Sequence, residues 1–247
     1  MKKQFSTAPL FAISFLCILF SLSLVLDLLQ PAAQSAASAS LPPLPVIILD
    51  AGHGGEDGGA TGSNGVLEKQ LNLSISCILA DLLRAAGFPV VQTRTEDKLL
   101  YGEGTKKGHK KQGDLENRLQ FTKEYPQGVF VSIHMNTFPT AECHGLQVWY
   151  SQNHPDSKLL AEAVQSSVKA LLQPQNNRRV KAATSSIYIL RHAETPAILI
   201  ECGFLSTPAE CELLCDEAYQ KSLSLAIFAA LLQNLSPGTC ENAENAL

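Results

Sequence analysis

From residue 46 onward the sequence alternates short β-branched runs with longer segments of helical periodicity, and this alternation limits the fold more than any other feature. Residues 46–49 are typical of a buried strand that ends at Asp50 and a glycine cluster. Apolar residues at 71–83 then recur at helical spacing, and Gly87 follows them. Strands alternating with helices of this length predict an α/β fold, with a mostly parallel or mixed twisted sheet that carries helices on both faces.

The same patterns predict the remaining elements of one domain. We expect further strands at 88–93, 129–134, 146–150, 187–190 and 197–201. We expect further helices at 114–125, 156–172 and 208–235, the last with room for one break. The chain shows no internal repeat and no second domain, so we expect a single domain over residues 46–235 and a flexible tail over residues 236–247.

The first forty residues have the parts of an export segment. Lys2 and Lys3 precede an apolar run at 9–26, and an alanine- and serine-rich stretch follows. The apolar run is also close to the roughly 20 residues that a membrane span needs. Two interpretations of residues 1–40 therefore stay open, a signal peptide and a membrane anchor. With either, residues 41–45 form a short linker and the rest of the chain is exported.

Charge limits the classes of partner. The net charge is −4, and a mildly acidic chain has no general attraction for nucleic acid, so we expect no nucleic-acid partner. One segment, 102–113, is instead basic, with four lysines and His109 among four glycines. A solvated, mobile loop is the simplest expectation for it. The alternative is a contact with an anionic polymer, a membrane surface or a partner.

Four polar residues stand at or next to the ends of predicted elements. His53, His134 and Glu201 lie just past, or at the last residue of, predicted strands, and Glu68 opens the first helix. The carboxyl ends of strands in an open α/β sheet are where ligands bind, so these side chains can meet there. A catalytic zinc takes three protein ligands and leaves one position open. His53, Glu68 and His134 supply that set, and Glu201 is left to act as a general base.

Each of these residues also has a simpler structural interpretation. His53 fits a turn residue in a glycine loop, and His134 fits a buried core histidine. Glu68 fits a first-turn residue favoured by the helix dipole, and Glu201 fits one half of an ion pair. The placement of all four at one edge of the predicted sheet favours a shared site.

The glycine loop after the first strand allows a rival function, that of a nucleotide-binding enzyme. A phosphate-binding loop typically places its backbone N–H groups at a helix N-terminus and often carries a lysine. This loop has no such lysine motif, and Asp50, Glu56 and Asp57 would repel phosphate. The glycines are better explained by close approach of the backbone to a metal site and a bulky substrate.

Together these motifs resemble the zinc-dependent N-acetylmuramoyl-L-alanine amidases of bacterial cell walls, amidase type 3. The resemblance spans residues 46–232 and is carried by Leu49-Asp-Ala-Gly-His-Gly-Gly55 with Asp57-Gly-Gly-Ala60, Glu68 before Asn72, Ser132-Ile-His-Met-Asn136 and Thr195-Pro-Ala-Ile-Leu-Ile-Glu-Cys-Gly-Phe-Leu-Ser206. It implies that His53, Glu68 and His134 hold Zn²⁺ and that Glu201 is the catalytic carboxylate. The implied reaction cleaves the amide between N-acetylmuramic acid and L-alanine in peptidoglycan.

The layout of one domain behind an export segment is similar to that of the spore-cortex amidases of the CwlD kind. That similarity implies cortex maturation through muramic-δ-lactam and an activating lipoprotein partner. Membrane attachment through the N-terminus is expected if residues 1–40 are an anchor. The alternative is a non-catalytic, zinc-containing module for wall binding or regulation. Chain order makes Asn136, Lys181 and Arg191 the candidate substrate contacts. Arg118 and Arg178 are further candidates, although a surface position is the simpler expectation for both.

Overall fold

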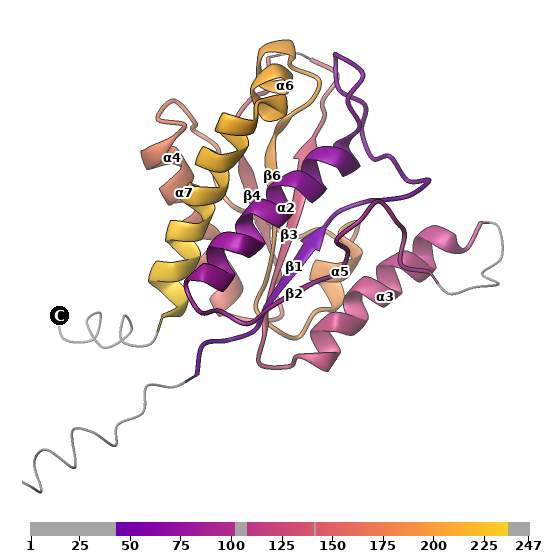
Figure 1. Ribbon diagram of the computed structural model, residues 1–247, viewed down its shortest axis with the longest axis vertical. Helices are drawn as coiled ribbons and strands as arrows, with labels where there is room; N and C mark the ends of the chain where they lie inside the picture. The colour runs from indigo at the N-terminus through magenta and orange to yellow at the C-terminus, as the bar shows by residue number, and fades with distance from the viewer. Residues whose placement is uncertain (1–42, 102–107, 141, 237–247) are drawn as a thin grey trace, which may run out of the picture. The chain divides into compact units, whose positions relative to one another are not determined.

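A six-stranded sheet runs through the residues that the computed structural model describes, namely 43–101, 108–140 and 142–236 (Figure 1). Its strand order is β2 (Val90–Gln92), β1 (Ile47–Ala51), β3 (Val129–Asn136), β6 (Ala197–Phe204), β4 (Gln147–Tyr150) and β5 (Lys181–Ala182). All neighbours pair in parallel except β4, which is antiparallel to β6. The sheet is therefore mixed and mostly parallel, as predicted, and the carboxyl ends of β1, β3 and β6 meet at one edge.

Helices cover both faces of this sheet because successive side chains of a strand point to opposite faces. On one face, Leu49, Val131 and Ile200 pack in a core with α2 (Glu68–Ala85), α4 (Asp156–Leu171), α6 (Pro208–Cys215) and α7 (Glu217–Leu235). Figure 1 shows α2 and α7 side by side in front of the sheet. On the other face, Ile48 and Phe130 pack with α3 (Lys110–Glu124) and α5 (Tyr188–His192). The predicted α/β class is confirmed.

The prediction of a strand at 187–190 is wrong. These residues lead into the short helix α5, whose Ile189 and Leu190 are buried in the core on the second face. A run of four apolar residues fits a strand and one turn of a buried helix equally well, so periodicity alone does not separate the two. The edge position in the sheet belongs instead to β5, a two-residue strand that the sequence pattern did not predict.

One helix boundary differs from expectation, and the break expected in the last helix is present. Helix α3 begins at Lys110, so the second half of the basic 102–113 segment includes the first turn of a helix rather than only a loop. The Lys110 ammonium lies 2.9 Å from Glu56 Oε1. The break expected in the last helix falls at Asp216, where the side chain accepts a hydrogen bond from Ala218 N at 3.0 Å and caps α7.

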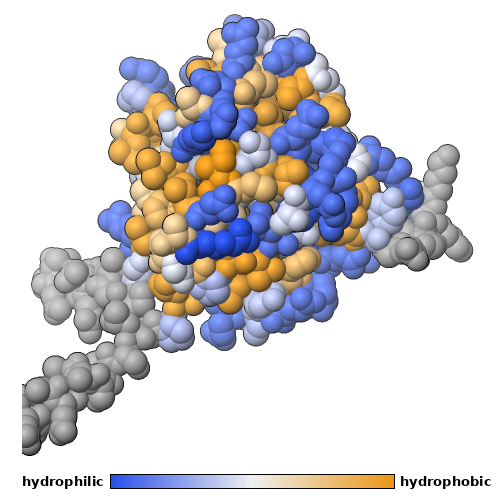
Figure 2. Space-filling model, in the orientation of Figure 1, coloured by the Kyte–Doolittle hydropathy of each residue, from blue (hydrophilic) through white to orange (hydrophobic). Residues whose placement is uncertain are grey.

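Residues 1–42 and 237–247 lie outside the described residues, so the signal peptide or anchor at 1–40, the 41–45 linker and the flexible tail stay predictions. Among residues 43–101, 108–140 and 142–236, no helix is long and apolar enough to cross a membrane. On the face shown in Figure 2, apolar and hydrophilic residues are interspersed.

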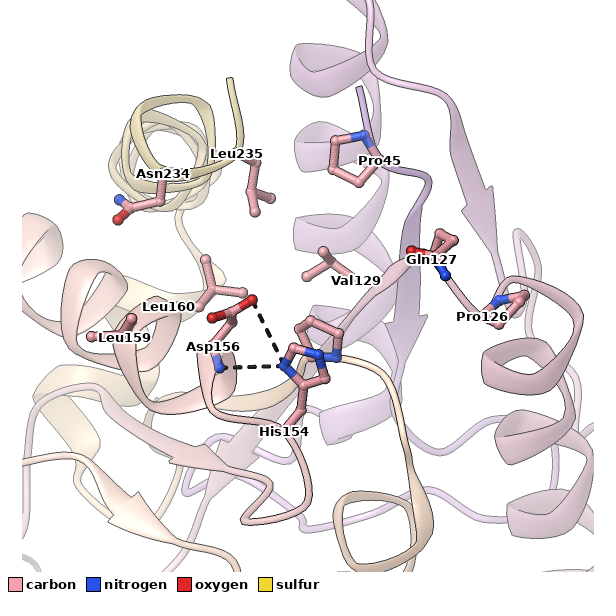
Figure 3. Close-up of a pocket in the computed structure, with 11 residues that line it drawn as sticks. Pro45, Pro126, Gln127, Val129, His154, Asp156, Leu159, Leu160, Asn234 and Leu235 are labelled. Atoms are coloured by element: carbon pink, nitrogen blue, oxygen red, sulfur yellow. Dashed lines mark hydrogen bonds and ion pairs between the residues drawn. The ribbon is translucent and has the colours of Figure 1, made fainter. Parts of the chain in front are cut away.

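A cavity of about 400 Å³ lies at the amino ends of the strands (Figure 3). Pro45 precedes β1, Val129 begins β3, and Leu160 of α4 and Leu235 of α7 complete the apolar part of its lining. This cavity is at the opposite end of the strands from the segments that carry the polar motifs.

Candidate active site

Two neighbouring parallel strands carry His134 and Glu201 to one edge and one face of the sheet. His134 of β3 and Glu201 of β6 are direct partners in the strand register. Phe130 of β3 and Leu199 of β6 pack on the face that α3 and α5 cover. His134 lies four residues after Phe130 and Glu201 lies two residues after Leu199, so both side chains point to that same face. A small cavity of about 60 Å³ opens there, with His53 and His134 in its lining.

The backbone at His53 is held in an unusual conformation. Its φ of 62° lies in the left-handed region, which costs a non-glycine residue roughly 1–2 kcal/mol. Two arginines that are each 2% exposed hold the carbonyl groups of this segment. Arg118 donates to Ala51 O at 2.8 Å and to His53 O at 2.7 Å, and Arg94 donates to Ala51 O at 2.8 Å and to Gly52 O at 3.0 Å. These bonds turn the carbonyls toward the core and stabilise the loop.

Two glycines allow the backbone to approach the site closely. A Cβ at Gly52 would lie 2.1 Å from Nε2 of His134, and a Cβ at Gly59 would lie 2.6 Å from Oε2 of Glu68. Gly59 also has a φ of 68°. Side chains at these positions would therefore displace His134 and Glu68, which agrees with the role that the sequence predicted for the glycine loop.

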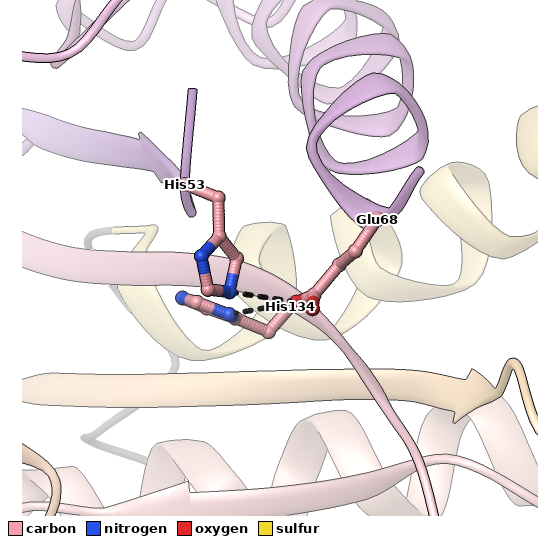
Figure 4. Close-up of side chains that lie close together, drawn as sticks. All are labelled: His53, Glu68 and His134. Carbon is pink, nitrogen blue, oxygen red and sulfur yellow. Dashed lines mark hydrogen bonds and ion pairs between the residues drawn. The ribbon is translucent and has the colours of Figure 1, made fainter. Parts of the chain in front are cut away.

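His53, Glu68 and His134 converge from β1, α2 and β3 (Figure 4). His53 Nε2 lies 3.3 Å and His134 Nδ1 lies 3.0 Å from the same oxygen, Glu68 Oε1. The ligand atoms of the three residues all lie within 4.8 Å of one another. Two ligands of one tetrahedral zinc ion are separated by roughly 3.3 Å, given bonds of about 2.0–2.2 Å. The three residues therefore fit a metal ion.

Neighbouring groups orient these side chains. The other ring nitrogen of His53, Nδ1, lies 2.9 Å from Asp57 Oδ2, and metal-bound histidines commonly donate their second N–H to a carboxylate. Glu68 Oε2 accepts a hydrogen bond from Ala60 N at 2.9 Å, and Oε1 accepts one from Asn72 at 3.3 Å. Asp57 and Asn72 are part of the motifs, but residue patterns do not reveal which groups they contact.

The charges of the three residues are strongly coupled. Burial would raise the pKa of Glu68, but hydrogen bonds from His134 and His53 outweigh that effect and hold the pKa well below its usual range. Burial would lower the pKa of His53, but contacts with Glu68 and Asp57 outweigh it and raise the pKa. The site therefore keeps an ionised carboxylate with low exposure to solvent, which attracts a cation.

Glu201 has the opposite electrostatic environment. Its Oε2 atom is buried and has no hydrogen-bond partner among the described residues. Burial raises the pKa of Glu201 to about 8, and the negative charge of Glu68 contributes in the same direction. A carboxyl group with a pKa near neutrality and a free oxygen beside a ligand cluster can both accept and donate a proton.

The three predicted substrate contacts lie on three different elements. Asn136 lies two residues beyond His134 on β3, on the same face. Lys181 lies on β5, with its ammonium 5.2 Å from the centre of the Trp149 ring. Arg191 is exposed on α5. Their substrate roles stay predictions.

The two arginines named as further candidates differ in their exposure to solvent. Arg118 is buried beneath the glycine loop, so the expected surface position is wrong for this residue. It is held there because the loop carbonyls and two carboxylates accept its hydrogen bonds. Arg178 is half-buried beside Gln147.

Comparison with known proteins agrees with the motifs and the site. Residues 47–233 match the family model described as N-acetylmuramoyl-L-alanine amidase. The germination-specific N-acetylmuramoyl-L-alanine amidase of Bacillus subtilis (strain 168) is 33% identical over 189 residues, which are 76% of this chain and 78% of that relative.

Solved structures are similar over the same region. The CwlD amidase from Clostridioides difficile, solved in complex with the GerS lipoprotein, has 39% identity and a TM-score of 0.72 over 76% of this chain and 96% of that chain. An N-acetylmuramoyl-L-alanine amidase from Clostridium difficile 630 has 32% identity and a TM-score of 0.67 over 77% and 96%. The chain therefore belongs to the N-acetylmuramoyl-L-alanine amidase family, among its CwlD-like members, and is an enzyme of that activity.

Proposed function

We propose that this enzyme hydrolyses the amide bond between N-acetylmuramic acid and L-alanine in peptidoglycan with Zn²⁺ held by His53, Glu68 and His134. The observation that carries the proposal is the convergence of His53 Nε2 and His134 Nδ1 on one oxygen of Glu68, beside the unpartnered oxygen of Glu201. Two imidazoles and one carboxylate are a typical donor set for a catalytic zinc with an open fourth position.

The protein groups have separate roles in the hydrolysis. Zinc, when bound, supplies a Lewis acid for the scissile carbonyl and lowers the pKa of a water molecule. Glu201 accepts the proton of the attacking water and passes a proton to the nitrogen of L-alanine as the C–N bond breaks. Asp57 holds the ring of His53, and the buried arginines hold the loop from which His53 extends. The products are a lactyl carboxylate and a peptide with a free N-terminal alanine.

We further propose an extracytoplasmic setting, with spore-cortex maturation through muramic-δ-lactam as the process and other cell-wall remodelling as the alternative. The relative named germination-specific supports the cortex. The relative solved with the GerS lipoprotein supports a lipoprotein as activating partner. Residues 1–40, as a signal peptide or a membrane anchor, would provide export and, in the second case, membrane attachment.

The deciding experiment compares the zinc-loaded wild-type enzyme with a Glu201→Gln variant on isolated peptidoglycan, with the products identified by mass spectrometry. We expect the wild type to release stem peptides that begin with alanine and to leave peptide-free muramic acid. The variant should keep its zinc, measured by atomic absorption, and lose about 10²- to 10⁴-fold in turnover, the usual contribution of a general base. Near-normal turnover by the variant would remove Glu201 from the mechanism. An inactive wild type with bound zinc would instead favour the non-catalytic wall-binding or regulatory module.

A further inference from the structure

Arg178 lies on the same face of the sheet as Glu201. Gln147 of β4 is the antiparallel register partner of Glu201, and directly opposite residues point to the same face with Cα atoms about 4.5–5.5 Å apart. Arg178 Nη1 donates a hydrogen bond to Gln147 Oε1 at 3.3 Å. The guanidinium is therefore separated from the region of Glu201 by a single side chain.

The guanidinium of Arg178 is fixed in orientation. Its Nε donates to His144 O at 2.7 Å, and its Cζ lies 4.3 Å from the centre of the Phe204 ring. Phe204 is the register partner of Asn136 after an irregularity in the β3–β6 pairing, so it belongs to the face that carries the site. Stacking on an aromatic ring together with two hydrogen bonds pre-organises an arginine side chain.

This fixed arginine has no carboxylate partner within ion-pair distance among the described residues, and none of them accepts a hydrogen bond from its Nη2. The charge of Arg178 acts to lower the pKa of Glu210, but the two oxygens of Glu210 accept hydrogen bonds from Gly145 N and Phe204 N at 2.8 Å each. The other arginines near the site differ. Arg118 pairs with two buried carboxylates, and all three guanidinium nitrogens of Arg94 donate to backbone carbonyls. A pre-organised guanidinium with free N–H groups is suited to bind a carboxylate.

The substrate of the proposed reaction carries carboxylates only on its peptide. The lactyl carboxyl group of muramic acid is part of the amide that is cleaved, and the sugars are uncharged. In a substrate whose peptide continues from L-alanine with a γ-linked glutamate, the carboxylate nearest the scissile bond is the free α-carboxyl group of that glutamate. Two extended residues span roughly 7 Å, which is longer than the roughly 4.8 Å that separates neighbouring strands such as β6 and β4.

We propose that Arg178 is a specificity-determining residue that binds this α-carboxylate and so marks the peptide side of the site. This subsite rests on the proposed amidase function. It makes the activity depend on the charge of the second peptide residue. By holding that carboxylate, Arg178 places the L-alanine nitrogen beside Glu201. A peptide whose second residue carries a carboxamide instead loses the ionic partner and binds more weakly.

The test uses two muramoyl peptides that differ only in carrying isoglutamate or isoglutamine at the second position. We expect the wild-type enzyme to prefer the isoglutamate substrate by about 10- to 100-fold in kcat/KM, the range of a hydrogen bond to a charged group. Arg178→Met should remove this preference by raising KM for the isoglutamate substrate, and should leave the isoglutamine substrate within about threefold. Arg178→Lys should retain part of the preference, because it keeps the charge and loses the planar fork.

The matched control is Arg179→Met, which removes the same charge from an exposed neighbour whose backbone carbonyl alone contacts Gln147. It should keep the wild-type preference, and both variants should keep full zinc content and an unchanged unfolding midpoint. Equal losses on both substrates in Arg178→Met would show a structural role through Gln147 and overturn the subsite. A wild type that cleaves both substrates equally well would overturn the subsite alone. A wild type that cleaves neither would overturn the proposed function and the subsite with it.

Discussion

At the scale of single residues, the site depends on how closely the backbone of the glycine loop approaches the three ligand side chains. Gly52 lies directly against the His134 ring, and the next residue, His53, adopts a left-handed conformation. The histidine is tolerated there because Arg94 and Arg118 bind the carbonyls around it. Local strain at this point is therefore coupled to the geometry of the ligand set.

Gly52→Ala should weaken metal binding while the protein stays folded. The added methyl group would overlap the His134 ring at about 2 Å, so the ring must leave the position in which it contacts Glu68. We expect at least a tenfold loss in zinc affinity, measured by competition with a chromophoric chelator, with a loss of activity at limiting zinc. Gly58→Ala is the control in the same loop, since its Cβ would contact Leu67 at an ordinary 3.4 Å. Unchanged zinc affinity in Gly52→Ala would contradict the close approach.

At the scale of elements, a buried ionic network joins β1, β3 and α3 beneath the site. Asp50 and Arg118 are 1% and 2% exposed, and Asp50 Oδ1 lies 2.5 Å from Arg118 Nη1. Ser132 and Thr93 donate to the same carboxylate at 2.6 and 2.7 Å, and Asp114 Oδ2 accepts from Arg118 Nε at 2.8 Å. A charge removed from such a network leaves its partner buried and unpaired.

Asp50→Asn should reduce the free energy of unfolding at pH 7 by about 3–5 kcal/mol, measured in urea. Burial alone would raise the pKa of Asp50, but the charge of Arg118 and the hydrogen bonds from Ser132 and Thr93 outweigh it and lower the pKa. The stabilisation from Asp50 is therefore complete above the unfolded-state pKa of about 4 and is lost as the pH falls through the lower folded-state pKa. The difference between wild type and variant should shrink progressively below about pH 4.

Asp81→Asn is the control for this pH dependence, because Asp81 is exposed and only 3.6 Å from its helical neighbour Arg84. Its effect on the free energy of unfolding should stay below about 1 kcal/mol. A stability difference for Asp50→Asn that does not change between pH 7 and pH 3 would show that packing, and not the ionised carboxylate, is the source of the stabilisation.

At the scale of the whole molecule, the proposed ligand set joins segments that are far apart in the sequence. His53, Glu68 and His134 come from the loop after β1, the first turn of α2 and the end of β3. Metal binding therefore requires these elements to be packed in their native arrangement, and in return it stabilises that arrangement.

Removal of zinc by a chelator should lower the unfolding temperature of the wild type. Free zinc at a hundred times Kd contributes about 2.7 kcal/mol, which for a domain of this size is roughly 5–11 °C. Glu201→Gln should show the same shift, because Glu201 is not one of the proposed ligands. His134→Ala should show little or none. An equal shift in His134→Ala would remove His134 from the ligand set.

The sequence by itself determined the α/β class, the main strands and helices, and the family. Buried strands and amphipathic helices each have a characteristic spacing of apolar residues, which can be recognised in a short stretch of sequence. The polar motifs lie next to the predicted strand ends. The sequence predicts a shared site for the residues at 53, 134 and 201 in this way, because parallel strands bring their carboxyl ends to one edge whatever the details of packing. Glu68 is predicted from its place at the start of the first helix.

Only the tertiary structure decided which partners each side chain meets. Residues 187–190 became part of a helix because Ile189 and Leu190 bury against the sheet, a choice that four apolar residues do not encode locally. Arg118 is buried because loop carbonyls and carboxylates from other elements surround it. Arg178 lies beside the site because the antiparallel pairing of β4 with β6 sets Gln147 opposite Glu201. Such contacts depend on strand register between distant segments, and no local pattern specifies that register.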